Sequence, residues 1–305
     1  MNTLPNRSID ISSEMTSFTR EQIRAYFHQT SDLYESLFET LKSDEAYYIK
    51  PINLRHPLIF YYGHTHTFFI NKLILAGLIT ERVHPQFESM FAVGVDEMGW
   101  DDVNEKNYDW PAPSAVKAYR AKVRQVVDQL IMSMPLTPSI DWESPWWPIL
   151  MGIEHERIHL ETSSVLIRQH DIRYVQPSAN WRPCQLVNSI APANSLVAIP
   201  AFDSVLNKST KHYGWDNEYG LSNVQCPGFQ AAKFLTSNAE FLRFVEAGGY
   251  QADQYWLEEG LAWKRYSHAE HPEFWVKDGL NWKLRVMTEE IVMPWSWPVE
   301  VNYHE

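Results

Sequence analysis

The chain has 305 residues, which leaves room for two domains of ordinary size, each with its own core. Hydrophobic residues make up 45% of the sequence and aromatic residues 14%, as in a folded globular protein. The formal net charge of −12 argues against broad binding of nucleic acids or anionic membranes, since both depend on an excess of Lys and Arg.

The N-terminus and the cysteines indicate the cellular compartment of the protein. The segment MNTLPNRSIDISSEM has no apolar signal core, and no apolar run of about 18 residues follows it. Cys184 and Cys226 stand in different contexts, which fits neither a disulfide framework nor a cysteine-based zinc site. We therefore expect a cytoplasmic protein with reduced thiols that binds neither nucleic acid nor membranes.

Four amphipathic helices are expected in the first half of the chain. The first begins near Thr19, with Ser17 or Thr19 as its cap, and the second follows Pro57. The third covers roughly 113–134 and the fourth 146–169. Residues 81–112 lack a sustained helical period and are expected to form a long connection, which is uncommon unless it is functional. This pattern predicts a four-helix bundle, a fold whose core often holds metals on facing helices.

The fourth helix carries a candidate pair of metal ligands. Ser144 before Pro145 is expected to cap it, and His155 and His159 lie four residues apart on one face. At that spacing both ring nitrogens can reach one metal ion. An isolated HxxxH pair is equally compatible with two packing histidines, so a third ligand is needed to decide.

The second helix offers two candidates for that third ligand. His64 and His66 lie about 200° apart around the helix axis, so they cannot face the same site. Periodicity alone does not choose between them. His64, His155 and His159 together would supply three neutral nitrogen ligands and leave coordination positions open, as suits catalytic Zn²⁺ or Fe²⁺.

The segment HERIH at 155–159 also permits a different chemistry. It satisfies the H-E-x-x-H pattern of zinc metalloproteases, in which Glu156 would be the general base. The longer HxxGxxH continuation is absent, because the chain reads LETSSVLIRQ after His159. A metal-dependent thiol-transferase bundle with the same ligand geometry is a further alternative.

The second half of the chain has a different texture. Residues from 171 to about 195 are rich in Pro, Asn and Ser, as in an interdomain linker. Short Trp- and Tyr-rich segments then predict an α+β unit of short strands. It contains one clear helix, TSNAEFLRFVEAGG, capped by Thr236 or Ser237 and ended by two glycines.

Long segments of the chain resemble the nonhaem iron sulfoxide synthases, most closely the ovothiol type, with the ergothioneine type as cousins. The matching segments are HPLIFYYGHTHTFFINKLILAGL at 56–78, FESMFAVGVDEMGWDD at 87–102 and MGIEHERIHLETSSVLIRQ at 151–169. The resemblance implies an α+β protein with a DinB-like metal-binding four-helix bundle at 1–175 and a linker at 176–194. Residues 195–305 would then be the first part of a formylglycine-generating-enzyme-like (C-type-lectin-like) domain.

The resemblance also implies a site and a reaction. It selects His64 over His66, because the family's first ligand is the histidine of the GHT segment, and assigns His155 and His159 as the other two. It implies Fe(II) as cofactor and dioxygen, cysteine and histidine as substrates. The implied reaction is oxidative carbon–sulfur bond formation with sulfoxidation, as in ovothiol biosynthesis. His66 would be a packing residue or a support for the ligands.

The resemblance departs from the family at the C-terminus. The family's second domain continues well past this point and later carries a tyrosine that acts near the bound oxygen, so Tyr303 is not that residue and the catalytic residues stay unassigned. A methyltransferase domain is absent too. The chain is thus expected to be a truncated copy, a fragment of a split protein or a partial gene model. In that case it is either an incomplete enzyme or a fragment that depends on a second chain.

Overall fold

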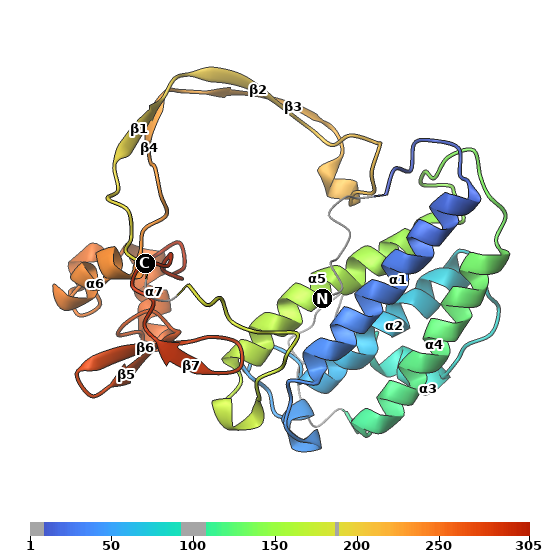
Figure 1. The fold of residues 1–305 in the computed structure, drawn as a ribbon, viewed down its shortest axis with the longest axis horizontal. Helices are drawn as coiled ribbons and strands as arrows, with labels where there is room; N and C mark the ends of the chain where they lie inside the picture. The colour runs from blue at the N-terminus through green and yellow to red at the C-terminus, as the bar shows by residue number, and fades with distance from the viewer. Residues whose placement is uncertain (1–8, 93–107, 187–188) are drawn as a thin grey trace. The chain divides into compact units, whose positions relative to one another are not determined.

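The computed structural model describes residues 9–92, 108–186 and 189–305. Their packing divides the chain into two compact units (Figure 1). The first comprises Met1–Trp181 and Asn207–Gly220, and the second comprises Arg182–Leu206 and Leu221–Glu305. The domain limits expected from the sequence stay predictions. In the structure, residues 207–220 pack with the first unit although they lie beyond the expected linker.

The first unit is built on four long helices that lie side by side (Figure 1). They are α1 (Ser17–Phe38), α2 (Leu58–Leu75), α4 (Pro113–Ser133) and α5 (Trp147–Gln169). Helix α2 packs against α4 and α5, and α1 packs against the same two helices. Short 3₁₀ turns at Asp44–Tyr47 and Ile172–Tyr174 follow α1 and α5. The expected helical bundle and the α+β class are confirmed.

The first turn of α1 begins earlier than expected. Thr16 is the N-cap, and its side chain accepts a hydrogen bond from the backbone N–H of Thr19. The Thr19 side chain in turn accepts from the backbone N–H of Thr16, which completes a capping box. The expected caps Ser17 and Thr19 were therefore wrong, although Thr19 does take part in the cap.

Helix α5 begins later than expected. Its first residue is Trp147, and Pro148 occupies the first turn. Proline is tolerated there because backbone N–H groups of the first turn form no hydrogen bond within the helix. Ser144 is not the cap, because it forms a preceding turn in which its Oγ accepts from the Trp146 N–H. Pro145 lies in that turn as well and is therefore not the first residue of the helix. The two histidines are unaffected, because they lie two turns further along.

The core of this unit lies between α1, α2, α4 and α5. Fully buried apolar side chains from all of these helices meet there, among them Ile23, Phe27, Phe69, Ile70, Leu73, Val123, Val127, Ile131, Ile149 and Ile153. Gly152 permits the close approach of α5 to α2, since a Cβ at this position would lie 2.2 Å from the Phe69 ring. The ligand-bearing helices are thus held in direct contact.

The connection between α2 and α4 is only partly described. Within the expected long, partly ordered connection lies a short helix, α3 (Pro85–Met90), capped by His84. Residues 93–107, and with them most of the matching segment at 87–102, lie outside the described residues. In the part of the chain that is described, no helix combines the length and apolarity needed to cross a bilayer.

The described part of the second unit contains two strand pairs and one three-stranded antiparallel sheet. Strand β1 (Leu196–Ile199) pairs with β4 (Phe229–Ala232), and β2 (Phe202–Asn207) pairs with β3 (Leu221–Cys226). The three-stranded meander consists of β5 (Trp275–Asp278), β6 (Asn281–Arg285) and β7 (Glu290–Val292). The core of the unit forms around Trp275, Leu284 and Met293 on and beside that meander.

Two helices accompany these strands. Helix α6 (Asn238–Glu246) is the expected one, capped by Ser237, whose side chain accepts from the Glu240 N–H. Helix α7 (Glu258–Ser267) was not expected. Its acidic first turn and basic last turn are the signals that could have predicted it.

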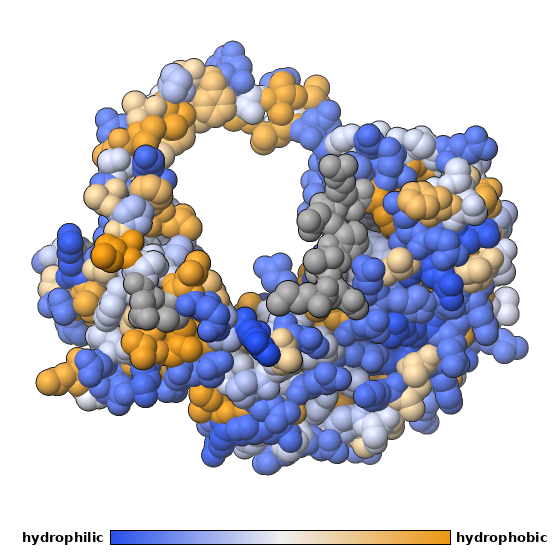
Figure 2. Space-filling model, viewed as in Figure 1, coloured by the Kyte–Doolittle hydropathy of each residue, from blue (hydrophilic) through white to orange (hydrophobic). Residues whose placement is uncertain are grey.

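The two strand pairs carry an exposed apolar surface. Figure 2 shows hydrophobic side chains along these strands. The exposed large residues there are Leu196, Val197, Phe202, Val205, Leu206, Leu221, Val224 and Phe229. Alternation of buried and exposed faces, which normally accompanies a packed antiparallel sheet, is therefore missing from these strands. The likeness of this unit to the formylglycine-generating enzyme stays a prediction.

Candidate metal centre

Three histidine rings meet in the core of the helical unit. His64 projects from α2, and His155 and His159 project from successive turns of α5. One ligand nitrogen from each ring lies within 4.8 Å of the other two. The ring centroids are 4.5 to 4.9 Å apart, and the Nε2 atoms of His64 and His155 are 3.2 Å apart. The structure therefore brings together all three histidines that were predicted from the sequence.

A backbone carbonyl orients the His64 ring. The Nδ1 atom of His64 lies 2.7 Å from the carbonyl oxygen of Phe91. A carbonyl can only accept, so Nδ1 donates and the neutral ring leaves a lone pair on Nε2. Gly63 makes this approach possible, because a Cβ there would lie 2.5 Å from the Phe91 ring. The Nε2 lone pair thus faces the two histidines of α5.

Aromatic side chains enclose the three rings. Phe60 stacks on His64 with centroids 5.1 Å apart, and Phe68 stacks on His155 at 3.7 Å. Tyr61 lies beside His159 at 5.9 Å. His64 and His155 are 2% and 7% exposed, so water has little access to their ring nitrogens.

The environment of His155 and His159 favours the neutral form of their rings. Burial is the main cause that lowers the pKa of His155 well below its usual value, and the neighbouring His159 and His64 lower it further. Burial and His64 likewise lower the pKa of His159 to about 3. A neutral imidazole is the form that binds metals, so these ligands need not lose a proton first.

The donor set fits a transition-metal ion. No described residue forms a hydrogen bond with the buried Nδ1 of His155, although buried polar atoms normally have a partner. Imidazole nitrogens suit iron, zinc, copper and nickel, whereas magnesium and calcium prefer oxygen ligands. Among the residues that the structure describes, these three histidines are the group of three or more potential ligands close enough to share one ion.

His66 lies on a different side of α2 and does not join the cluster. It is fully buried, and its Nδ1 is 3.4 Å from Oε1 of Glu156. Burial and the nearby Arg120 lower the pKa of His66, while Glu156 acts in the opposite direction. The sequence argument that His64 and His66 face different surroundings is thus matched by the structure.

Glu156 follows a ligand in the sequence but points away from the cluster. Its Oε1 accepts hydrogen bonds from Nη2 of Arg120 at 2.9 Å and from the hydroxyl of Thr65 at 3.0 Å. Burial would raise the pKa of this carboxyl, but His66 and Arg120 outweigh burial and lower the pKa to about 2. A carboxylate held in this way is unsuited to the general-base role that the H-E-x-x-H pattern would require.

Arg120 is the member of this network that sequence reasoning missed. It lies on α4 and is fully buried, next to Tyr119 in a stripe of apolar positions. Arginine is seldom fully buried unless it is paired, so the residue type gives no sign of this burial, whereas its position between Val116 and Val123 on the apolar face of α4 does. Its burial is explained by partners on the neighbouring helices, chiefly Glu156 of α5 and Thr65 of α2.

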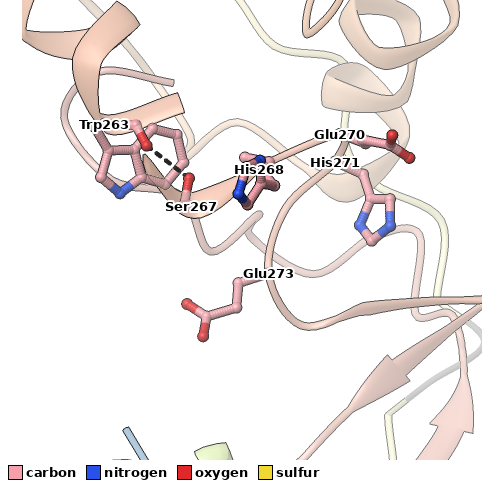
Figure 3. A pocket seen from close by; sticks show the side chains of 7 residues that line it. Trp263, Ser267, His268, Glu270, His271 and Glu273 are labelled. Carbon is pink, nitrogen blue, oxygen red and sulfur yellow. Dashed lines mark hydrogen bonds between the residues drawn. The ribbon is translucent and has the colours of Figure 1, made fainter. Parts of the chain in front are cut away.

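A second set of histidines and acids lines a pocket at the end of α7. Figure 3 shows His268, His271, Glu270 and Glu273 around a cavity of about 320 Å³, with the two imidazole rings well separated. Their ligand atoms do not converge in the way those of the three bundle histidines do. This pocket therefore offers no comparable metal centre.

Comparison with known proteins agrees with this description. Residues 26–163, which contain all three histidines, match the DinB superfamily. Ergothioneine biosynthesis protein 1 of Neurospora crassa is 27% identical over 64% of this chain and 24% of its own length. Hercynine oxygenase of Mycolicibacterium smegmatis is 26% identical over 49% of this chain and 33% of its own length.

The chain thus spans about a quarter to a third of the length of the curated relatives it matches. The match of residues 26–163 to the DinB superfamily, together with the similarity to these two relatives, confirms the resemblance of the chain to the sulfoxide synthases of the ovothiol and ergothioneine type.

Proposed function

We propose that this chain is the Fe(II)-binding part of an O₂-dependent sulfoxide synthase of the ovothiol type, with His64, His155 and His159 as the metal ligands. The observation that carries the proposal is the convergence of three imidazoles, two buried and one half-buried, from two facing helices of the region that matches the DinB superfamily, with ligand nitrogens within 4.8 Å of one another. The relationship to an ergothioneine biosynthesis protein and to a hercynine oxygenase supports oxidative chemistry at this site.

The protein's own residues would bind and shield the ion. Neutral nitrogen ligands leave the charge of Fe(II) uncompensated, and three of them leave coordination positions open for a substrate thiolate and dioxygen. The Phe91 carbonyl fixes the His64 ring, and the stacked Phe60 and Phe68 rings limit the access of water. When bound, iron would supply the reduction of dioxygen that the oxidation of a thiol requires.

The proposed reaction balances with one molecule of dioxygen. The cysteine thiol and the imidazole C–H each lose one hydrogen, and a carbon–sulfur bond forms between them. One oxygen atom is added to sulfur as the sulfoxide, and the other leaves as water with the two hydrogens. Sulfur is oxidised and dioxygen accepts four electrons in total. The O₂ consumed should therefore equal the sulfoxide formed.

The test is anaerobic reconstitution with Fe(II), followed by metal analysis and by O₂ consumption in the presence of cysteine and histidine. We expect one iron per chain, and none above background in His155→Ala. A reconstituted parent protein that retains no iron would refute the site. Iron uptake without sulfoxide formation from either histidine or a methylated histidine would refute autonomous catalysis but not the site.

A second candidate is a partner-dependent subunit with the same metal centre. The exposed apolar side chains of β1 to β4 support it, because a contiguous apolar surface of this kind usually contacts another protein or another part of the same protein. Co-expression with the coding sequence that lies next to this one would then restore O₂ consumption to an iron-loaded but inactive chain.

The metal-dependent hydrolase and thiol-transferase alternatives have weaker support. The hydrolase would use Glu156 as general base, yet that carboxylate is paired with Arg120 inside the bundle. A thiol transferase would use the same three ligands and would show thiol-transfer activity without O₂. Assaying the zinc-loaded protein for anaerobic thiol transfer separates this alternative from the sulfoxide synthase.

A further inference from the structure

A charged network lies beside the three histidines, on the neighbouring faces of the same helices. Arg120, from α4, is fully buried and donates from Nη1 to the Tyr62 carbonyl at 2.8 Å and to the Thr65 hydroxyl at 2.9 Å. Its Nη2 donates to Glu156 of α5 at 2.9 Å. One guanidinium group therefore joins α2, α4 and α5 at a single point.

Two tyrosine rings and a second carboxylate complete the surroundings of this guanidinium. Tyr34 and Tyr62 lie on it with the guanidinium carbon 5.1 and 4.9 Å from their ring centroids. Glu35 Oε1 lies 3.4 Å from Nε of Arg120. The group thus has few alternative positions, because the rings fix its plane and the acceptors fix its rotation.

The network touches the residues next to the ligands in the sequence. Thr65 follows His64, and Glu156 follows His155. The Thr65 hydroxyl donates directly to Glu156 at 3.0 Å, while the Nε2 atoms of His64 and His155 lie 3.2 Å apart. Adjacent residues on a helix are about 100° apart, so the Thr65–Glu156 and His64–His155 contacts lie on neighbouring faces of the same two helices. A rotation or slide of α2 against α5 would therefore break both of these contacts.

The energetics suggest that this network does more than stabilise the bundle. A buried ion pair gains little over well-packed apolar residues, and replacement of both partners is often neutral or stabilising. A polar network that offers little net stability can instead select one arrangement of helices among several with similar apolar packing.

We propose that Arg120, Glu156 and Thr65 are positioning residues, which fix the register of α2 against α5 so that the rings of His64, His155 and His159 converge. This inference rests on the proposed metal site. It assigns no proton transfer to Glu156 and no ligand role to any of the three.

The test replaces both charges at once. Arg120→Met/Glu156→Met removes both charges of the fully buried ion pair, and the Glu35 carboxylate, which loses its contact with Arg120, is partly exposed to water. We therefore expect the variant to fold with a melting temperature near that of the parent. Its affinity for Co(II), measured by competition with a chromophoric chelator, should fall by about 10- to 100-fold, the range found when partners of metal ligands are lost. The visible absorption spectrum of bound Co(II) should change as well.

A matched control separates positioning from general effects of charge. Arg24 of α1 and Asp128 of α4 form a two-hydrogen-bond ion pair at 2.7 and 3.2 Å that touches neither α2 nor α5. Arg24→Met/Asp128→Leu should leave both the Co(II) affinity and the spectrum unchanged. Equal loss of affinity in the two double variants would overturn the proposal, as would an unchanged affinity in a folded Arg120→Met/Glu156→Met protein.

A second variant decides the matter if the double variant does not fold. Thr65→Val keeps both charges and nearly the same side-chain shape, and it removes the hydroxyl that links α2 to Glu156 and Arg120. We expect a smaller loss of Co(II) affinity at an unchanged melting temperature. Parental affinity and spectrum in this variant would then contradict the positioning role.

A metal-free measurement distinguishes failure of this inference from failure of the proposed function. In the parent protein, the His64 ring should show a single tautomer protonated at Nδ1, because this atom donates to Phe91. Nitrogen-15 spectra of the imidazoles should show that tautomer lost in Arg120→Met/Glu156→Met. If the parent takes up no Co(II), the metal site fails, while these spectra still test whether the network orients the rings.

Discussion

Two buried polar clusters lie side by side on α2 and α5, and they are satisfied in opposite ways. The charged cluster pairs Arg120 with Glu156 and Thr65 through hydrogen bonds of 2.9 to 3.0 Å. In the cluster of three histidines, burial and the neighbouring rings disfavour protonation of His155 and His159. The first cluster pairs opposite charges, although Oε2 of Glu156 has no hydrogen-bond partner among the described residues, whereas the second brings three ring nitrogens of the same kind together. That difference is typical of a ligand-binding site beside the structure that supports it.

The largest effect is expected from removing one histidine of the metal centre. His155→Ala should abolish the stabilisation of the protein by Zn(II) or Fe(II), because two imidazoles from different helices hold an ion far more weakly than three. The parent's melting temperature should rise with metal concentration and that of the variant should not. Thermal unfolding with and without metal measures this. An equal rise in both proteins would contradict the assignment of His155.

Breaking the charged cluster on one side should cost stability directly. Glu156→Leu leaves the Arg120 guanidinium buried without its carboxylate, which typically costs about 3–5 kcal/mol of unfolding free energy. Urea denaturation of the metal-free protein provides the measurement. Simultaneous replacement of Arg120 by Met should recover most of the loss. A single variant as stable as the parent would show that the pair is not desolvated as described.

Substitution of two glycines tests the close packing around α2 and α5. Gly63→Ala and Gly152→Ala both push a methyl group into a phenylalanine ring, at 2.5 Å from Phe91 and 2.2 Å from Phe69. Each should cost about 1–3 kcal/mol, as overpacked positions do. Gly63→Ala displaces the residue whose carbonyl orients His64, whereas Gly152→Ala pushes apart the two helices that carry the ligands, so both variants should also bind metal more weakly. Urea denaturation and Co(II) titration of both variants test these effects.

The depressed pKa values of His155 and His159 predict a pH dependence of stability in the metal-free protein. Below about pH 6.5 the unfolded chain protonates both rings, whereas the folded protein keeps them neutral down to lower pH. The unfolded state then binds more protons, so stability should fall as the pH drops from about 6.5 toward 4, by at most about 1.4 kcal/mol per pH unit for each ring.

Urea denaturation at a series of pH values, compared with His155→Phe/His159→Leu, isolates this contribution. The variant should lose less stability than the parent over the same range. Parallel curves for the two proteins would mean that other groups carry the pH dependence.

The smallest expected effect concerns a helix end far from both clusters. Thr16→Ala removes the side chain that caps α1 and should cost about 1 kcal/mol, within the usual range for an N-cap. It should leave metal affinity unchanged, as measured by the same chelator competition. A loss of metal binding in Thr16→Ala would show that the cluster responds to any loosening of the bundle.

The sequence predicted the helical part well because its signals are local. Apolar periodicity located the bundle helices, and the four-residue spacing of His155 and His159 placed them on one face of α5. Helix ends were less predictable, since Ser144 and Pro145 form a turn that competes with the cap they suggest. Helix α7 has few apolar positions, and only its terminal charges hint at it.

The choice between His64 and His66 needed information that periodicity does not contain. The helix geometry separates the two rings, but which of them meets α5 depends on how the helices pack. The same holds for Arg120, whose burial follows from Glu156 and Thr65 on other helices. Non-local partners therefore limited the prediction of the site, while local patterns predicted its most recognisable pair.

The account depends most on which histidine of α2 belongs to the metal centre. Anaerobic titration with Fe(II) of the parent, His64→Ala and His66→Ala tests this directly. We predict one tightly bound iron per chain in the parent and in folded His66→Ala, and none in His64→Ala. Retention of tight iron binding by His64→Ala, or its loss only in His66→Ala, would contradict the three-histidine centre described here.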